Sequence, residues 1–272
     1  MYLRSLATAT PPHTFTQADT WRALQSHPDF STLKPRSISL LEKILTNSSS
    51  GIATRQFTTA DLGSVFDQGA EELNRSFEAH SPTLATEALT KAIAKADLHA
   101  EKIDALFVCT CTGYLCPGPS SHIAESLGLR PDASLCDLIG LGCGAAIPTL
   151  RAASHLLAAR PDATVACIAV EICSAVFYLD DDPGVIISAC LFGDGAAAVV
   201  MVGSRRAERM GLSGPTVVAS RSRMYPDTTR TMGWDIGASG FRIVLSAGVP
   251  EVITRYLGDD VTDFLGDHDL KT

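Results

Sequence analysis

The 272-residue sequence predicts an α/β protein, and three observations lead to that prediction. Several short runs, such as IDALFVCTCTG and ATVACIAVEI, are apolar throughout. Strands of this kind are buried on both faces of a parallel or mixed sheet. They alternate with segments whose apolar residues recur at three- and four-residue steps, the helical period. The hydrophobic content of 46% is enough for a large core, in one large domain or two fused ones.

The elements follow one another in a regular order. Residues 1 to about 80 resemble a polar, helical lead-in, with helical spacing in TQADTWRALQ, ISLLEKILTN and DQGAEELNRSFEAH. A separate helix is expected to begin at Ser81-Pro82, because proline at the first helical position loses no required hydrogen bond. The later elements are a strand at 103–113, a helix at 119–129, a strand at 134–140, a helix to about Ala159, a strand at 163–172 and a helix–turn–strand at 187–203.

A boundary is expected in the polar, glycine-containing segment that begins at Gly203. We therefore divide the chain into a first domain, 1–203, and a partial second domain, 204–272. In the second domain, 216–225 and 241–246 are predicted strands, and 249–257 and 261–268 are predicted helices. A second α/β layer equal to the first would need more strands than these.

Composition and charge exclude several classes of protein. A net charge of −8 argues against a broad nucleic-acid surface. No window is apolar for the roughly 18 residues of a membrane helix, and the N-terminus lacks a signal-peptide core, so a cytoplasmic protein is expected. The eight cysteines are then reduced thiols. CTCTGYLC lacks the paired C-x2-C spacing of zinc sites, so no metal and no cofactor is predicted.

One cysteine, Cys143 in GLGCGAA, lies where an apolar strand passes into a helix. The free N–H groups and dipole at a helix N-terminus favour a thiolate, which is the nucleophilic form. Gly142 and Gly144 permit a tight turn and leave room for a substrate beside the sulfur. Cys143 has the position of an acyl-accepting nucleophile; the alternative is a small apolar residue that packs at a helix start.

Six segments in the same order give this sequence a family resemblance. They are SGIATR (50–55), VCTCTGYLCPG (108–118), GLGCGAAIPTLRAA (140–153), VEICSAVFY (170–178), LFGDGAAAVV (191–200) and GWDIGASGFRIVLSAGVP (233–250). Together they resemble the type III polyketide synthases, the chalcone and stilbene synthase family, and especially its bacterial members.

The resemblance implies a thiolase-like fold of αβαβα layers, with the N-terminal half complete and the C-terminal half incomplete. It implies a homodimer that transfers a starter acyl group from acyl-CoA to Cys143. Decarboxylation of malonyl-CoA then gives the carbanion that condenses with the thioester. CoA thioesters are the substrates, and no further cofactor is implied.

The resemblance also implies roles for single residues. Phe192 matches an aromatic gatekeeper between the CoA tunnel and the condensation cavity, and Phe241 lies near a second gatekeeper. Cys116 lies where plant members carry a methionine that reaches into the partner's cavity. The other matched cavity-lining positions are Cys111, Thr112, Cys173 and Val176. Glu171 and Asp194 are interpreted as a structural carboxylate and a turn residue.

The family's catalytic histidine and asparagine segments have no counterpart in this sequence. His268, in GDHDLKT, is not a substitute. We therefore expect a C-terminally truncated chain with little or no activity. Two alternatives stay open: another thiolase-fold condensing enzyme, such as a β-ketoacyl carrier-protein synthase III or a hydroxymethylglutaryl-CoA synthase, and a catalytically silent subunit that pairs with an intact synthase.

Overall fold

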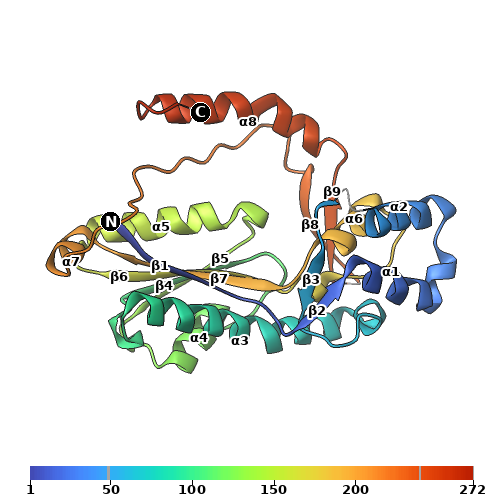
Figure 1. Ribbon diagram of the computed structural model, residues 1–272, viewed down its shortest axis with the longest axis horizontal. Coiled ribbons are helices and arrows are strands. Elements are labelled where there is room, and N and C mark those ends of the chain that lie inside the picture. The colour runs from blue at the N-terminus through green and yellow to red at the C-terminus, as the bar shows by residue number, and fades with distance from the viewer. Residues whose placement is uncertain (48–49, 239, 272) are drawn as a thin grey trace.

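The computed structural model describes residues 1–47, 50–238 and 240–271, so Ser239, inside one of the segments quoted above, and Thr272 lie outside the described part. A five-stranded mixed sheet forms its centre, in the order β1 (Tyr2–Ala9), β7 (Gly195–Val202), β6 (Thr164–Glu171), β4 (Ala105–Thr110) and β5 (Ser134–Ile139) (Figure 1). Strand β4 runs parallel to β5 and β6, whereas β7 is antiparallel to β6 and β1. The α/β prediction is confirmed.

Helices cover both faces of this sheet. Helices α3 (Ala70–Ala96) and α4 (Pro119–Leu127) lie on one face, and α5 (Ala146–Ala159) lies on the other (Figure 1). Fully buried side chains such as Phe77, Leu89 and Ile168 fill the first interface, while Leu157 and Val165 belong to the second. The apolar strand sequences follow from this burial on both faces.

A second cluster of elements lies at one end of the sheet. It contains β2 (His13–Thr16), α1 (Gln17–Ser26), α2 (Pro35–Thr46), β3 (Thr54–Phe57) and α6 (Pro183–Leu191). Their apolar side chains, among them Leu24, Leu41 and Phe57, form a separate core. Short 3₁₀ turns occur at Pro28–Thr32, Ser64–Asp67, Ala100–Lys102, Gly142–Gly144 and Cys173–Val176.

The segment after β7 is less compact. Helix α7 (Ser204–Arg209) is followed by an extended stretch, the hairpin β8 (Met232–Gly237) and β9 (Gly240–Leu245), and helix α8 (Val249–Gly266). The hairpin packs on α6 and α3. Helix α8 contains no buried residue and lies away from the sheet, on the α5 side (Figure 1). The expected boundary at 203/204 falls between β7 and α7 and stays a prediction.

Several predicted elements were wrong. The lead-in contains β1, which pairs with β7 and is a full member of the sheet. The helix expected to begin at Ser81 begins at Ala70 and continues through Pro82, because Phe77 before the proline and Leu89 after it pack into the same core.

The C-terminal predictions also needed correction. Residues 216–225 form no strand; within the described chain only Thr216 makes an isolated bridge, to Tyr2. Strand β8 arises in a segment interpreted as a connection, since its hairpin partner β9 decides its conformation. The two helical pieces are one continuous helix, α8.

Candidate active site

The three parallel strands end at one edge of the sheet. Strand β4 is followed by Cys111, β5 by Gly140, and β6 ends at Glu171. Ligand sites of open α/β sheets lie outside the carboxyl ends of such strands. The fold therefore gathers three of the segments singled out above at a single edge.

Cys143 lies in a tight turn between β5 and α5. Gly140 and Gly142 have φ angles of +83° and +63°, in the left-handed region that favours glycine. Cys143 occupies the Gly142–Gly144 3₁₀ turn and is solvent-exposed, and α5 begins three residues later at Ala146. The glycines thus present the sulfur at the sheet edge, just ahead of the helix.

Glu171 organises the loop after β4. Its carboxylate accepts hydrogen bonds from the backbone N–H groups of Cys111 and Thr112, each at 3.0 Å. The Thr112 hydroxyl also donates to Glu171, at 2.7 Å, and accepts from the N–H of Ile172 at 2.9 Å. This agrees with the interpretation of Glu171 as a structural carboxylate, and it fixes the backbone that carries Cys111.

Cys111 and Cys143 form a thiol pair. A hydrogen bond from the Cys111 side chain lowers the pKa of Cys143 from 9.0 to about 7, although burial and the Glu171 charge oppose this. The same hydrogen bond, together with burial, raises the pKa of Cys111. The Trp234 side chain partly opposes this rise in the pKa of Cys111. Cys143 is therefore the thiol of the pair with the lowered pKa, the property that favours the nucleophilic thiolate form.

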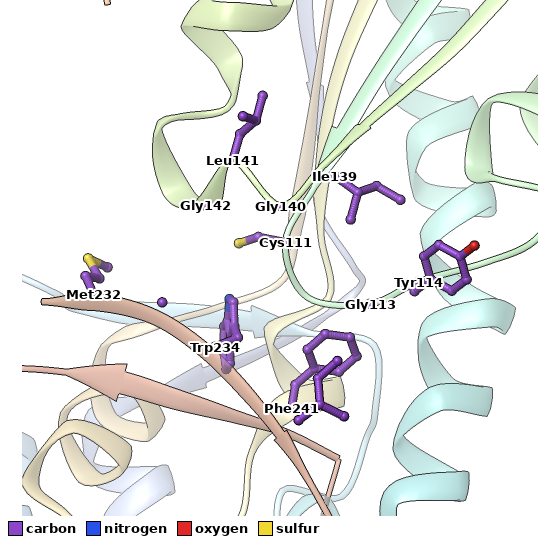
Figure 2. Close-up of a pocket in the computed structure, with 12 residues that line it drawn as sticks. Cys111, Gly113, Tyr114, Ile139, Gly140, Leu141, Gly142, Met232, Trp234 and Phe241 are labelled. Atoms are coloured by element: carbon purple, nitrogen blue, oxygen red, sulfur yellow. The ribbon is translucent and has the colours of Figure 1, made fainter. Parts of the chain in front are cut away.

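An apolar cavity of about 460 Å³ is lined by Cys111 and by Gly142, the chain neighbour of Cys143; Cys143 itself is not among the lining residues. Figure 2 shows the Cys111 sulfur pointing toward the space between the Gly142 turn and Trp234. The ring of Trp234 meets that of Phe241 edge-on, with centroids 6.3 Å apart. The described residues of the lining are Cys111, Gly113, Tyr114, Ile139, Gly140, Leu141, Gly142, Met232, Gly233, Trp234, Ile236 and Phe241. Among them is neither a histidine nor an asparagine.

The structure brings some of the expected pocket residues to this site and leaves others elsewhere. Cys111 and Phe241 line the cavity, and Thr112 and Phe241 line an adjoining one of about 230 Å³. Cys173 is buried, and burial raises its pKa, with smaller contributions from the charges of Asp194, Glu171 and Cys143. Cys116 is exposed, beside a cis peptide bond to Pro117.

Phe192 and Val176 line neither of these two cavities, as far as the described residues define them. Phe192 ends α6, is half-buried and packs on the second apolar core. Val176 is buried at the end of its 3₁₀ turn. Their predicted roles stay predictions.

Trp234, Met232 and Tyr114 also line the cavity, and none of them was predicted as a site residue. Trp234 lies inside GWDIGASG, a segment quoted for the resemblance. Along residues 232–237 the apolar Met232, Trp234 and Ile236 alternate with glycine and aspartate, which is the pattern of a strand with one apolar face. This strand signal was missed because the segment of β8 was interpreted as a connection between two strands.

Asp194 is more than a turn residue. It is buried and accepts hydrogen bonds from the backbone N–H groups of Thr58 (2.9 Å) and Ser174 (2.8 Å) and from the Ser174 hydroxyl (2.7 Å). Burial raises its pKa despite these donors. Asp194 thus ties β3 to the turn after β6.

Two features are absent from the part of the chain that the structure describes. No group of three or more histidine, cysteine or acidic side chains there is arranged to hold a metal ion. None of the helices is both long and apolar enough to cross a membrane.

Comparison with known proteins decides the family. Residues 2–218 match the family described as FAE1/Type III polyketide synthase-like protein. This chain belongs to the type III polyketide synthase family. These matches favour that interpretation over the ketoacyl synthase alternative.

Individual relatives agree with this membership. The chain is 36% identical over 268 residues to a 1,3,6,8-tetrahydroxynaphthalene synthase of Streptomyces peucetius subsp. caesius, covering 97% of this chain and 68% of that protein. It is 30% identical over 175 residues to a putative chalcone synthase of Bacillus subtilis (strain 168), covering 63% and 48%. The chain therefore spans about half to two thirds of the length of these relatives.

A solved structure confirms the thiolase-like fold expected from the family. The crystal structure of the polyketide synthase PKS-I from the brown alga Ectocarpus siliculosus superposes with a TM-score of 0.88 at 25% identity. The match covers 99% of this chain and 73% of the other. The αβ layers described above are thus those of a type III polyketide synthase.

Proposed function

We propose that Cys143 accepts an acyl group from an acyl-CoA as the first step of a decarboxylative condensation with malonyl-CoA. The observation that carries the proposal is the position of Cys143: it is exposed, has a lowered pKa, and lies at the sheet edge beside an apolar cavity of about 460 Å³. An apolar cavity of this size can hold the carbon chain of an acyl group that is bound to the Cys143 sulfur.

The proposed reaction has two steps, acyl transfer and decarboxylative condensation. The Cys143 thiolate attacks the thioester carbonyl, a new C–S bond forms, and the CoA thiolate leaves with the electron pair of the old one. Loss of CO₂ from malonyl-CoA leaves the electron pair on the carbon next to its thioester, and this carbon attacks the Cys143 thioester. Cys143 returns as a thiolate. The covalent intermediate keeps the chain next to the following extender, which replaces a bimolecular encounter.

The surrounding residues would shape the product. Cys111 and Phe241 line the cavity, and small changes of volume or polarity there discriminate between substrates by a few kcal/mol. We extend the same role to Thr112, Cys173, Val176 and Cys116 from the family resemblance. Phe192 and Phe241 are proposed as aromatic faces along the path of the CoA thioester.

We further propose a homodimer in the cytoplasm. All eight cysteines are free thiols, which fits a reducing compartment. The net charge of −8 gives no support for nucleic acid as a partner.

Acylation of the protein tests this function directly. We expect incubation with acyl-CoAs of several chain lengths to add one acyl group to the Cys143 peptide, as detected by mass spectrometry. The variant Cys143→Ala should stay unlabelled, while Cys136→Ala, which removes another exposed thiol, should label like the parent. Equal labelling of the Cys143→Ala variant and the parent would show that the nucleophile lies elsewhere.

The condensation step has its own readout. Because the described cavity lining contains no imidazole and no carboxamide, we expect the 272-residue chain to accumulate the acyl-enzyme and to release little product from malonyl-CoA. Chromatography of the reaction after long incubation distinguishes acylation from turnover. Rapid formation of pyrones or phenols would contradict this expectation.

A further inference from the structure

A buried arginine holds the C-terminal end of helix α6. Arg55, in β3, is only 4% exposed, and one of its terminal nitrogens donates to the carbonyl oxygens of Ala189 (2.7 Å) and Phe192 (2.8 Å). The other terminal nitrogen donates to the Thr20 hydroxyl at 2.9 Å. The last carbonyls of a helix have no intrahelical partner, and a cation there also suits the helix dipole. Arg55 is thus a side-chain cap for α6.

This arrangement is costly for the fold. The described hydrogen bonds of Arg55 go to two carbonyls and a hydroxyl, its Nε has no partner there, and the Asp194 charge gives only a small compensation. Burial lowers the pKa of the guanidinium to about 10. The Phe57 ring, 5.0 Å away, offsets part of the cost. An apolar side chain would often serve stability better at such a place, and departures from that rule tend to mark function.

The same short strand holds the rest of the turn after α6. The Asp194 N–H donates to the carbonyl of Gln56 at 2.9 Å, and the Asp194 carboxylate accepts from Thr58 and Ser174. Gly193 packs against β3: a Cβ atom there would lie in van der Waals contact with the Gln56 oxygen, at 3.4 Å. The backbone of residues 192–194 is therefore fastened to β3 along its whole length.

We propose that Arg55 is a positioning residue, which fixes Phe192 and the 192–194 turn relative to the acyl-accepting Cys143. The turn is linked to the site by hydrogen bonds from Ser174 to Asp194. Ser174 follows Cys173, a buried thiol on which the Cys143 charge acts. Arg55 is buried and lines neither of the two cavities at the site, so its effect on the reaction would pass through the turn. The kinetic part of the inference rests on the proposed function; the structural part does not.

Backbone amide exchange tests the structural part. In Arg55→Lys the ammonium keeps the charge but cannot bond both carbonyls and Thr20 at once. Since a charged hydrogen bond is worth about 1.5–3 kcal/mol, we expect the amides of Phe192 and Asp194 to exchange roughly tenfold faster or more. The control is Arg206→Lys, at a half-buried arginine near Asp104 that does not touch the turn. Unchanged exchange at Phe192 and Asp194 in Arg55→Lys would overturn the inference.

Two reactions of Cys143 test the kinetic part. Misplacement of the turn should slow acylation by acyl-CoA about tenfold in Arg55→Lys. Alkylation by iodoacetamide, a small reagent, should stay within about twofold of the parent rate, because the thiolate itself is unaltered. Equal acylation of the two proteins, or a parallel fall in both reactions, contradicts a positioning role. If the parent protein is not acylated, the proposed function fails, and amide exchange alone decides the role of Arg55.

Discussion

The acid–base chemistry of Cys143 gives a pH dependence that can be measured without substrate. Its pKa of about 7 lies below the ordinary value of 9.0, so half of the thiol is ionised near neutral pH. Only the thiolate is alkylated, so the rate should rise with pH through a midpoint near 7 and level off above it. Peptide mass spectrometry after iodoacetamide treatment separates Cys143 from the exposed Cys116 and Cys136. A midpoint for Cys143 near 9 would contradict the lowered pKa.

The neighbouring thiol supplies the next prediction. The hydrogen bond from Cys111 is the largest cause of the lowered pKa of Cys143. Cys111→Ala removes that donor and should move the alkylation midpoint upward, toward the ordinary thiol value. Cys111→Ser keeps a donor of similar size and should hold the midpoint close to that of the parent. The same midpoint in both variants would show that Cys111 does not stabilise the thiolate.

For single residues, the sequence predicts sites that depend on chain neighbours, and it misses sites that depend on the pairing of strands. Cys143 could be found because its glycines and the following helix are neighbours in the chain, and the structure places it in the turn between β5 and α5, as expected. Trp234 could not, because it reaches the cavity only through the pairing of β8 with β9. Phe192 packs on the second core, and the gatekeeper role that its motif implies stays a prediction.

Among the elements, α3 is the one in which packing overrides local preference. It continues through Pro82, which removes one helical hydrogen bond from a helix of 27 residues. The apolar side chains on both sides of the proline share one core, and their burial outweighs that loss. Strand β1 is a similar case, since its membership of the sheet comes from pairing with β7, 186 or more positions away along the chain and invisible in the local pattern.

Replacement of Pro82 by alanine should therefore stabilise the protein. The alanine restores an N–H donor within α3, against a smaller loss from a more flexible unfolded chain, and we expect a net gain of about 1–2 kcal/mol. Urea unfolding followed by circular dichroism measures it. Pro35→Ala is the matched control, because Pro35 is exposed at the first turn of α2, where proline loses no bond. A Pro82 variant that is no more stable than the Pro35 variant would mean that the proline costs α3 nothing.

Over the whole molecule, apolar side chains are distributed unevenly. The face of the sheet covered by α3 and α4 is well buried, whereas the side that carries β5, α5 and α8 leaves several large apolar residues exposed by 38–54%. They are Leu135, Ile139, Leu141, Ile147, Ile253, Leu257 and Val261. On α8, three of them recur at every fourth residue and so form one stripe along the helix. The amino-acid composition could not predict this uneven distribution, because the exposure of a side chain depends on which elements pack against its helix or strand.

This stripe predicts how the 272-residue protein behaves in solution. Contiguous apolar surface binds hydrophobic dyes and promotes self-association, whereas isolated apolar residues do so weakly. Replacing Ile253 and Leu257 together by glutamine should lower the fluorescence of bound bis-ANS and reduce concentration-dependent association in sedimentation velocity runs. Val218→Gln is the control: its side chain is 80% exposed but lies outside α8. We expect that variant to match the parent in both measurements. If the double variant also matched the parent, the α8 stripe would not be the surface that binds the dye and promotes self-association. The exposed apolar residues of β5 and α5 would then be replaced next.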